Sequence, residues 1–406
     1  MKSITREDKL SYYEDHHEIF DSKAIDTRAV HVGQPSDAIH GSINVPIHMT
    51  SIYSQEDCGV PTFDHMYGRD GNPTRDALEK CIASLENGKF GLVANSCMSV
   101  SMLAIHLLKH GDGMICIDDI CAATGTYLKK IVKPNYGIEI DYVNFRDTKN
   151  IEDCMKENTK MVWMESPSNP LLEIYDIKAV AEICKENNII LVVDNTLMSP
   201  YFQNPLQLGA TIVIQSVTKY LGGHSDLVMG ALVTNDEDLY QSMRETCSIM
   251  GQTVSPMDCY LVLRSLKTFP LRMKKINKNG TKVAAFLEEN TQVDKVYYPM
   301  LKSHEGYELH KSQATGGAGL VCFELKDADC EEAKIFLKSL KIFELCKSLG
   351  GVQSCASCPS VMSHKKMPKE EREKIGIKDG LIRLAIGVED IDDIIEDLEQ
   401  ALKKIQ

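Results

Sequence analysis

The sequence has no long apolar run, no excess of positive charge and no apolar segment near its amino terminus. No apolar stretch reaches about 18 residues, the length that a membrane-spanning helix requires, so we expect no span across a bilayer. The net charge is −13, which argues against nucleic acid or an anionic membrane as the main partner. The charged amino terminus is unlike a secretory signal.

The 14 cysteines do not follow the spacing of a metal site, and we predict no bound metal. Most lie inside apolar runs, as Cys116 does, which is typical of buried, reduced thiols in a cytoplasmic protein. Cys355 and Cys358 form a single C-x-x-C pair. We interpret this pair as structural, with a redox or zinc role as the alternative, because no second pair accompanies it.

The chain shows no internal repeat or low-complexity tract, but its 406 residues exceed one ordinary core, which predicts two domains. Residues 1–60 are polar and irregular and are expected to form an amino-terminal arm. Residues 61–262 alternate between strand and helix patterns. Residues 263–406 begin with a long helical pattern through Asn290, continue with short strands such as 319–323 and 381–386, and close with an amphipathic helix over 391–405.

The middle region predicts an α/β sheet covered on both faces, and the last region a smaller α+β domain. The expected strands are apolar runs at 114–117, 138–145, 161–164, 189–193, 211–214 and 231–234. The expected helices between them include 73–85, 98–109 and 177–185. Ligands bind at the carboxyl ends of the strands in such sheets, so residues that follow these runs are candidates for a site.

Lys219 follows the 211–214 run together with the hydroxyls of Ser216 and Thr218. A lysine amine can bind an aldehyde cofactor covalently as a Schiff base, and the hydroxyls suit a phosphate. Asp194 ends the neighbouring run, where a carboxylate can keep a pyridine nitrogen protonated. Together these residues predict a pyridoxal phosphate (PLP) site, with an ordinary solvated lysine as the alternative.

A second phosphate contact is expected at the start of the helix that follows Phe90–Ala94. Ser96 is a candidate cap for this helix, and the free N–H groups of a helix start bind anions. The segment lacks the Gly-Lys-Ser of a nucleotide-binding loop, so by itself it is a weak signal.

From His31 onward the sequence resembles the cysteine and methionine metabolism family of fold-type I PLP-dependent enzymes, above all its cystathionine γ-lyases. The resemblance depends on motifs that recur in order along the chain, namely Tyr67–Arg75, Val192–Gln203, Thr218–Asp226, Ser255–Leu261, Ser348–Gly351 and Leu381–Leu384. It implies the fold of this class, a small amino acid as substrate, and elimination or replacement at its γ or β carbon.

The resemblance also implies roles for single residues. Lys219 would bind the cofactor and move protons, Asp194 would pair with the ring nitrogen, and Asn169 would lie near the ring hydroxyl. The cofactor phosphate would be held by Ser216, Thr218, the amides of Cys97 and Met98, and Tyr67 and Arg69 of a neighbouring subunit. Arg383 would bind the substrate carboxylate and Ser348 would line the pocket. A site shared in this way implies at least a homodimer, and the family usually forms tetramers.

The sequence departs from the family where substrate and cofactor ring would meet. Cys121 replaces a ring-stacking tyrosine, which leaves space over the ring and brings a softer, more acidic group into the reacting centre. Thr126 and Lys347 replace an arginine and a glutamate near the distal end of the substrate, and Cys97 replaces the usual glycine.

These departures leave three hypotheses open. The enzyme acts on cystathionine or a similar sulfur-containing amino acid, or on a γ-substituted amino acid whose leaving group is not a thiol, or it binds PLP without turnover. Lys347 favours an acidic distal group on the substrate. The sequence does not determine the exact substrate, the position of elimination, or whether lysis or replacement follows.

Overall fold

The structure is a computed structural model that describes residues 20, 22–37, 39–365 and 367–405. Its larger sheet has seven strands in the order β3-β9-β8-β7-β6-β4-β5. These strands are β3 Phe90–Ala94, β4 Gly113–Ile117, β5 Glu139–Val143, β6 Thr159–Glu165, β7 Ile190–Asp194, β8 Ile212–Ser216 and β9 Gly230–Thr234. All six strands predicted from apolar runs are therefore confirmed, with small shifts at their ends.

The strands from β8 to β5 are parallel, and β9 runs antiparallel to both β8 and β3. Successive residues of a strand enter different cores. Ile115 and Val162 belong to one buried cluster, whereas Cys116 and Trp163 belong to another. Because side chains alternate between the two faces of a sheet, both faces are covered, as the alternating strand and helix pattern predicts.

The helices around this sheet are α3 Pro73–Leu85, α4 Cys97–Ile105, α5 Ala122–Tyr127, α6 Lys133–Tyr136, α7 Lys149–Cys154, α8 Ile177–Glu186, α9 Ser199–Phe202 and α10 Glu237–Ile249. Three of them, α3, α4 and α8, confirm the helices predicted at 73–85, 98–109 and 177–185. Asn72 caps α3 by accepting hydrogen bonds from the amides of Thr74 and Arg75, and Pro73 occupies its first position. Helix α4 ends four residues earlier than the pattern over 98–109 predicts.

The long helical pattern that was predicted from residue 263 through Asn290 is confirmed in its main part by helix α12, which spans Phe269–Glu288. The first residues of the pattern, 263–266, belong instead to the end of helix α11, which spans Pro256–Leu266. Pro270 lies in the first turn of α12, where its missing N–H leaves no helical hydrogen bond unmade. A proline suits a helix start and not a helix interior, so α12 begins here as a separate helix.

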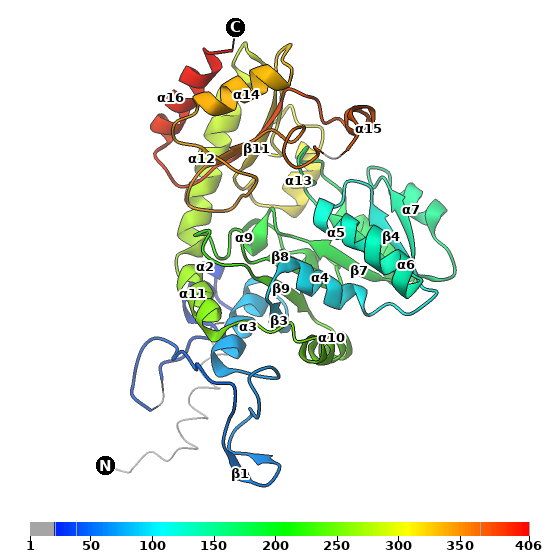
Figure 1. Ribbon diagram of the computed structural model, residues 1–406, viewed down its shortest axis with the longest axis vertical. Helices are drawn as coiled ribbons and strands as arrows, with labels where there is room; N and C mark the ends of the chain where they lie inside the picture. The colour runs from blue at the N-terminus through cyan, green and yellow to red at the C-terminus, as the bar shows by residue number, and fades with distance from the viewer. Residues whose placement is uncertain (1–19, 21, 38, 366, 406) are drawn as a thin grey trace.

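The carboxyl-terminal part has a five-stranded sheet in the order β10-β11-β14-β13-β12. Its strands are β10 Val293–Tyr297, β11 Leu320–Leu325, β12 Glu344–Leu345, β13 Cys355–Ser357 and β14 Leu381–Ala385. The helices here are α13 Tyr307–Gln313, α14 Cys330–Ser339, α15 Lys369–Lys374 and α16 Ile391–Leu402. Figure 1 shows this part at one end of the molecule, with α12 leading into it from α11.

The amino-terminal region is less irregular than its composition suggests. Helix α2, Ile25–His31, packs on α3 and α12, and its Ala29 is fully buried. Strands β1 Gln55–Asp57 and β2 Val60–Pro61 form a hairpin at the end of the molecule opposite α16 (Figure 1). Residues 1–19, 21 and 38 of the expected arm lie outside the described residues. The boundaries at 60 and 262 remain predictions.

No helix within the described ranges has both the length and the apolar character that crossing a bilayer requires.

Candidate active site

Lys219 lies on the turn that follows β8, at the carboxyl edge of the large sheet. Its Nζ donates a hydrogen bond to Ser348 Oγ at 3.0 Å. Burial, and then the charge of Arg383, lower the pKa of Lys219 from its usual value. The amine is thus half-buried, hydrogen-bonded and closer to its neutral form, unlike the solvated lysine of the alternative interpretation.

Ser348 connects Lys219 to a buried arginine. Arg383, on β14, donates from Nη2 to the backbone oxygen of Ser348 at 3.1 Å, from Nη1 to Asn169 Oδ1 at 3.4 Å, and from Nε to Ser357 Oγ at 3.2 Å. Its side chain is 8% exposed, and no carboxylate of the described residues forms an ion pair with it. A buried cation without a countercharge favours an anionic ligand.

Two carboxylates meet at the ends of adjacent strands. Asp194 ends β7 and Glu165 ends β6, and the two residues are register partners. Burial raises the pKa of both groups, and the charge of Asp194 raises that of Glu165 further. Thr196 N–H donates to Asp194 Oδ1 at 2.9 Å, but no cation of the described residues pairs with either carboxylate. A cationic ligand group here would relieve their mutual repulsion.

Cys121 is tied to this carboxylate pair. It precedes α5, and its backbone N–H donates to Glu165 Oε1 at 2.9 Å. Desolvation, and then the charge of Glu165, raise the pKa of the Cys121 thiol to about 11. Burial and the nearby carboxylates both oppose a negative charge on the thiol, so the surroundings of Cys121 add nothing to its acidity. That Cys121 is more acidic than the tyrosine it replaces stays a prediction.

The start of α4 has the features expected of a phosphate cradle. Ser96 caps the helix by accepting from Ser99 N–H at 3.1 Å, and Cys97 and Met98 are its first residues. Gly230 lies against them, because a β-carbon at this position would come within 2.4 Å of Ser96 O and 2.6 Å of Cys97 Cα. A glycine is required for this close approach of β9 to the helix start.

The two candidate hydroxyls after β8 differ in their surroundings. Thr218 Oγ1 donates to Met229 O at 3.2 Å and accepts from Met229 N–H at 3.0 Å. The backbone N–H of Ser216 donates a hydrogen bond to Thr196 Oγ1 at 2.8 Å. The hydroxyl group of Ser216 has no partner among the described residues. Ser216 is therefore free to bind a ligand, whereas Thr218 already holds the backbone of Met229.

The remaining candidates lie at the edges of this cluster or away from it. Thr126, on α5, is exposed and donates to Ala122 O at 2.7 Å, and Lys347 is exposed next to Ser348. Tyr67 and Arg69 lie on the exposed loop before α3, and the Arg69 guanidinium lies over the Tyr67 ring. Neither contacts Lys219 within the described chain.

Sequence reasoning missed Glu165, Thr196 and Ser357. Glu165 carried the same signal as Asp194, since both are carboxylates that end an apolar strand of the same sheet. The roles of Thr196 and Ser357 depend on hydrogen bonds between segments far apart in sequence, and no local pattern announces these.

A PLP molecule fits the residues that are present. A protonated ring nitrogen would provide the cation that Asp194 and Glu165 lack, and the α4 start would accept a phosphate. Such a lysine at the carboxyl edge of a mixed seven-stranded sheet, beside a smaller carboxyl-terminal unit, defines the fold-type I class of PLP-dependent enzymes.

Comparison with known proteins identifies the family within this class. Residues 26–403 match the model of the Cys/Met metabolism PLP-dependent enzymes, and the chain belongs to this family. It is 44% identical over 380 residues to the cystathionine gamma-lyase of Dictyostelium discoideum, covering 94% of this chain and 98% of the relative. The cystathionine gamma-lyase of Homo sapiens is 45% identical over 379 residues, with 93% of each chain covered.

A solved structure agrees with the fold. The metB protein of Corynebacterium glutamicum superposes with a TM-score of 0.91 at 36% sequence identity, and the match covers 95% of this chain and 99% of the other. The resemblance stated from the sequence motifs is thereby confirmed. The protein is a PLP-dependent enzyme similar to cystathionine γ-lyases.

Proposed function

We propose that this enzyme catalyses elimination at the γ carbon of cystathionine or a closely similar amino acid. The observation that carries the proposal is the hydrogen-bonded series Lys219–Ser348–Arg383 beside the Asp194 edge. It places a proton-transferring amine one hydrogen-bonded residue away from a buried guanidinium that has no carboxylate partner among the described residues. The similarity to the cystathionine gamma-lyases named above supports an amino acid of this class as the substrate.

In this proposal PLP, when bound, would supply the electron-withdrawing ring. Lys219 would hold the cofactor, and its amine would take the proton from the α carbon and pass it on. Arg383 would bind the α-carboxylate through its fork, and Asn169, which accepts a hydrogen bond from the same guanidinium, is assigned to the cofactor's ring hydroxyl. Asp194 would keep the ring nitrogen protonated, and Ser348, which accepts a hydrogen bond from Lys219 Nζ, would orient that amine.

The phosphate is assigned to Ser216, Thr218, the amides of Cys97 and Met98, and Tyr67 and Arg69 of a neighbouring subunit. This last assignment requires at least a homodimer, and we propose a dimer of dimers. Large apolar side chains around the Tyr67 loop are exposed in the isolated chain, which supports an interface there; they are Ile39, Ile43, Met49, Ile52, Phe63 and Met66.

A cytoplasmic location also belongs to the proposal. All 14 cysteines are free thiols, which fits a reducing compartment. Cys358 is buried and its Sγ lies 3.0 Å from Ser360 Oγ, which supports a structural role for the C-x-x-C pair.

A second candidate is a γ-substituted amino acid with an acidic or non-thiol leaving group. It is favoured by exposed Lys347, which has no acidic partner among the described residues, together with Cys121, which precedes α5, and Thr126, which lies in its last turn. The third hypothesis, PLP binding without turnover, remains open because Cys121 provides no aromatic face to the ring.

The test is a panel of cystathionine, homocysteine, methionine, O-acylated homoserines and γ-halogenated analogues, with ketoacid release and the cofactor absorption band as readouts. Fast release from cystathionine supports the first candidate, and release only from the esters or halides supports the second. A band that no amino acid changes supports the third. Full turnover by Lys219→Ala would overturn all assignments to Lys219, and Lys130→Ala, an exposed site, is the control.

A further inference from the structure

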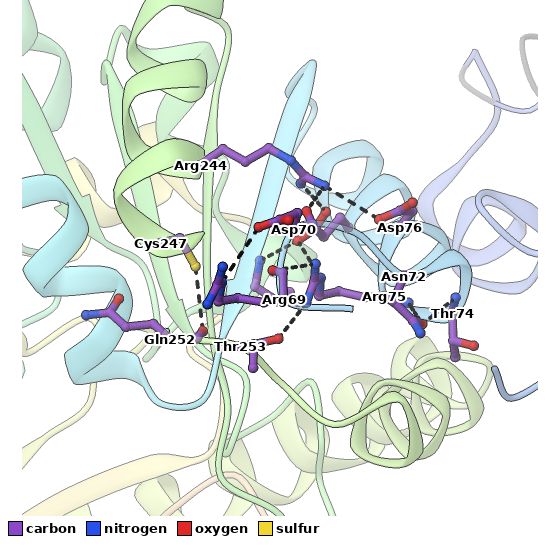
Figure 2. A network of polar contacts seen from close by, with 12 residues as sticks. Arg69, Asp70, Asn72, Thr74, Arg75, Asp76, Arg244, Cys247, Gln252 and Thr253 are labelled. Atoms are coloured by element: carbon purple, nitrogen blue, oxygen red, sulfur yellow. Dashed lines mark hydrogen bonds and ion pairs between the residues drawn. The ribbon is translucent and has the colours of Figure 1, made fainter. Parts of the chain in front are cut away.

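The loop before α3 is fixed through its backbone by two arginines (Figure 2). The carbonyl oxygens of three consecutive residues each accept a hydrogen bond from a guanidinium. Arg75 Nη1 donates to Gly68 O at 3.1 Å, and Arg75 Nη2 donates to Arg69 O at 3.2 Å. Arg244 Nη2 donates to Asp70 O at 3.2 Å.

Two side chains of the same loop, those of Tyr67 and Arg69, are largely exposed, although Arg69 Nε also lies 3.8 Å from Asp70 Oδ1. Tyr67 is 44% exposed and the Arg69 side chain is 50% exposed. The Arg69 guanidinium lies 5.3 Å from the centroid of the Tyr67 ring. The loop is thus held from behind while two large side chains are presented to the outside of the chain.

The two arginines come from different helices and share one buried carboxylate. Glu79, on α3, accepts from Arg244 Nη1 at 2.9 Å and from the Val93 N–H at 3.1 Å. Arg75 Nε lies 4.0 Å from Glu79 Oε1. Glu79 is 6% exposed, and the Val93 contact fixes it to strand β3. We call Arg75, Arg244 and Glu79 the clamp. The clamp therefore anchors the loop to the rigid sheet and not to another loop.

Contacts beyond Glu79 extend the clamp to α10 and the segment after it. Arg75 Nη1 donates to Thr253 Oγ1 at 2.6 Å, and the Ser248 hydroxyl donates to the Asp70 carboxylate. Arg244 Nη2 also lies 3.7 Å from Asp76 Oδ1. The loop is connected in this way to three separate elements.

A clamp of this composition is better suited to precision than to stability. Taking guanidinium and carboxylate groups out of water costs free energy that their attraction roughly offsets, so such networks contribute little net stability. Arg69 and Asp70 are exposed and Gly68 is half-buried, so water would satisfy their carbonyl groups without the arginines. What the arginines add is a defined loop conformation, which a residue that must reach a phosphate across an interface requires.

We propose that Arg75, Arg244 and Glu79 are positioning residues that hold the 67–70 loop in the shape with which Tyr67 and Arg69 reach the cofactor phosphate of the neighbouring subunit. The inference rests on the proposed function, specifically on the shared phosphate site. These three residues act in one subunit and serve the active site of another.

The first measurement is PLP affinity, titrated by absorbance. Arg244→Lys keeps a positive charge opposite Glu79, but its single nitrogen cannot serve Glu79 and Asp70 O together. We expect it to fold and to lose about tenfold in PLP affinity, the effect of one charge-assisted hydrogen bond. The control is Arg372→Lys, which alters a buried arginine that bonds Ile377 O and Asp379 in the carboxyl-terminal part. Its PLP affinity should not change.

The second measurement separates action across the interface from a general structural effect. Arg244→Lys subunits are coexpressed with Lys219→Ala subunits and held at a PLP concentration between the two dissociation constants. Borohydride then fixes PLP on Lys219, and mass spectrometry counts the tagged Arg244→Lys subunits. Pairing with a Lys219→Ala subunit gives them an intact loop, so the tagged fraction should rise from low occupancy to about half.

The same mixing with Arg69→Ala in place of Arg244→Lys tests the shared site itself. If the tagged fraction rises for Arg69→Ala but stays low for Arg244→Lys, the positioning role is overturned and the shared site stands. If it rises for neither, the proposed phosphate contact across subunits fails first. Unchanged PLP affinity in Arg244→Lys would also overturn the inference.

Discussion

Lys219 donates its hydrogen bond to Ser348 because Gly350 lets the segment after β12 reach the backbone of Lys219. Gly350 has a φ of +80°, and a β-carbon there would come within 2.6 Å of Tyr220 N and 2.8 Å of Lys219 C. Two segments 129 residues apart in the chain therefore meet through a residue without a side chain.

Gly350→Ala should push this segment away from Lys219 and lower both PLP affinity and turnover by about tenfold or more, since backbone on both sides prevents relaxation. Gly111→Ala is the matched control, because Gly111 has a φ of +89° with nothing within 4 Å of its β-carbon position. The control should lose only about 1–2 kcal/mol of unfolding free energy from φ strain. Equal activity in the two variants would contradict the proposed contact.

Cys121→Tyr should raise kcat/KM for cystathionine by about fivefold, because an aromatic ring stacked on the cofactor is worth about 1 kcal/mol. Steady-state kinetics with cystathionine would check this. The exposed Cys58→Tyr serves as control for adding an aromatic side chain. A fall in activity would mean that the space over the ring is used by the natural substrate.

Arg383→Lys should raise KM about tenfold to a hundredfold with a smaller change in kcat, because lysine cannot form the two parallel hydrogen bonds of a guanidinium with a carboxylate. The comparison variant is again Arg372→Lys, a buried arginine that does not contact Ser348 or Asn169. Should kcat fall and KM stay constant, Arg383 would not be the carboxylate site.

The buried carboxyl group of Glu86 should make the free energy of unfolding depend on pH. Burial raises the pKa of Glu86 to about 7, and Gln215 Nε2 donates to it at 2.6 Å. The folded state therefore binds this proton more tightly than the unfolded chain, whose glutamate has a pKa near 4.5. The contribution of this bound proton to the free energy of unfolding is complete below about pH 4.5, declines as pH rises to 7, and is lost above that value.

Glu86→Gln removes this titration while keeping an acceptor for Gln215. Relative to the wild type, the variant should gain about 1–3 kcal/mol of unfolding free energy between pH 5 and pH 8. Urea unfolding at the two pH values measures the difference. An exposed glutamate, as in Glu186→Gln, should show no such trend.

The sequence by itself determined the strands of the large sheet and much of the site. Apolar runs ending in Asp194 or followed by Lys219 were enough to place both groups at one sheet edge, since parallel strands end on the same side. It also determined the family, because motifs in order along the chain are specific. The same local logic applied to Glu165, which the prediction overlooked.

Only the tertiary structure decided the burial, the neighbouring charges and the hydrogen-bond partners of those groups. The thiol of Cys121 has a raised pKa because the folded chain removes it from water and, to a lesser degree, because it brings the carboxylates of Glu165 and Asp194 close to it. The clamp of Arg75, Arg244 and Glu79 depends on hydrogen bonds between a helix start and a helix 165 residues further on. Such effects depend on burial and on distances through space, and neither is encoded in the spacing of residues along the chain.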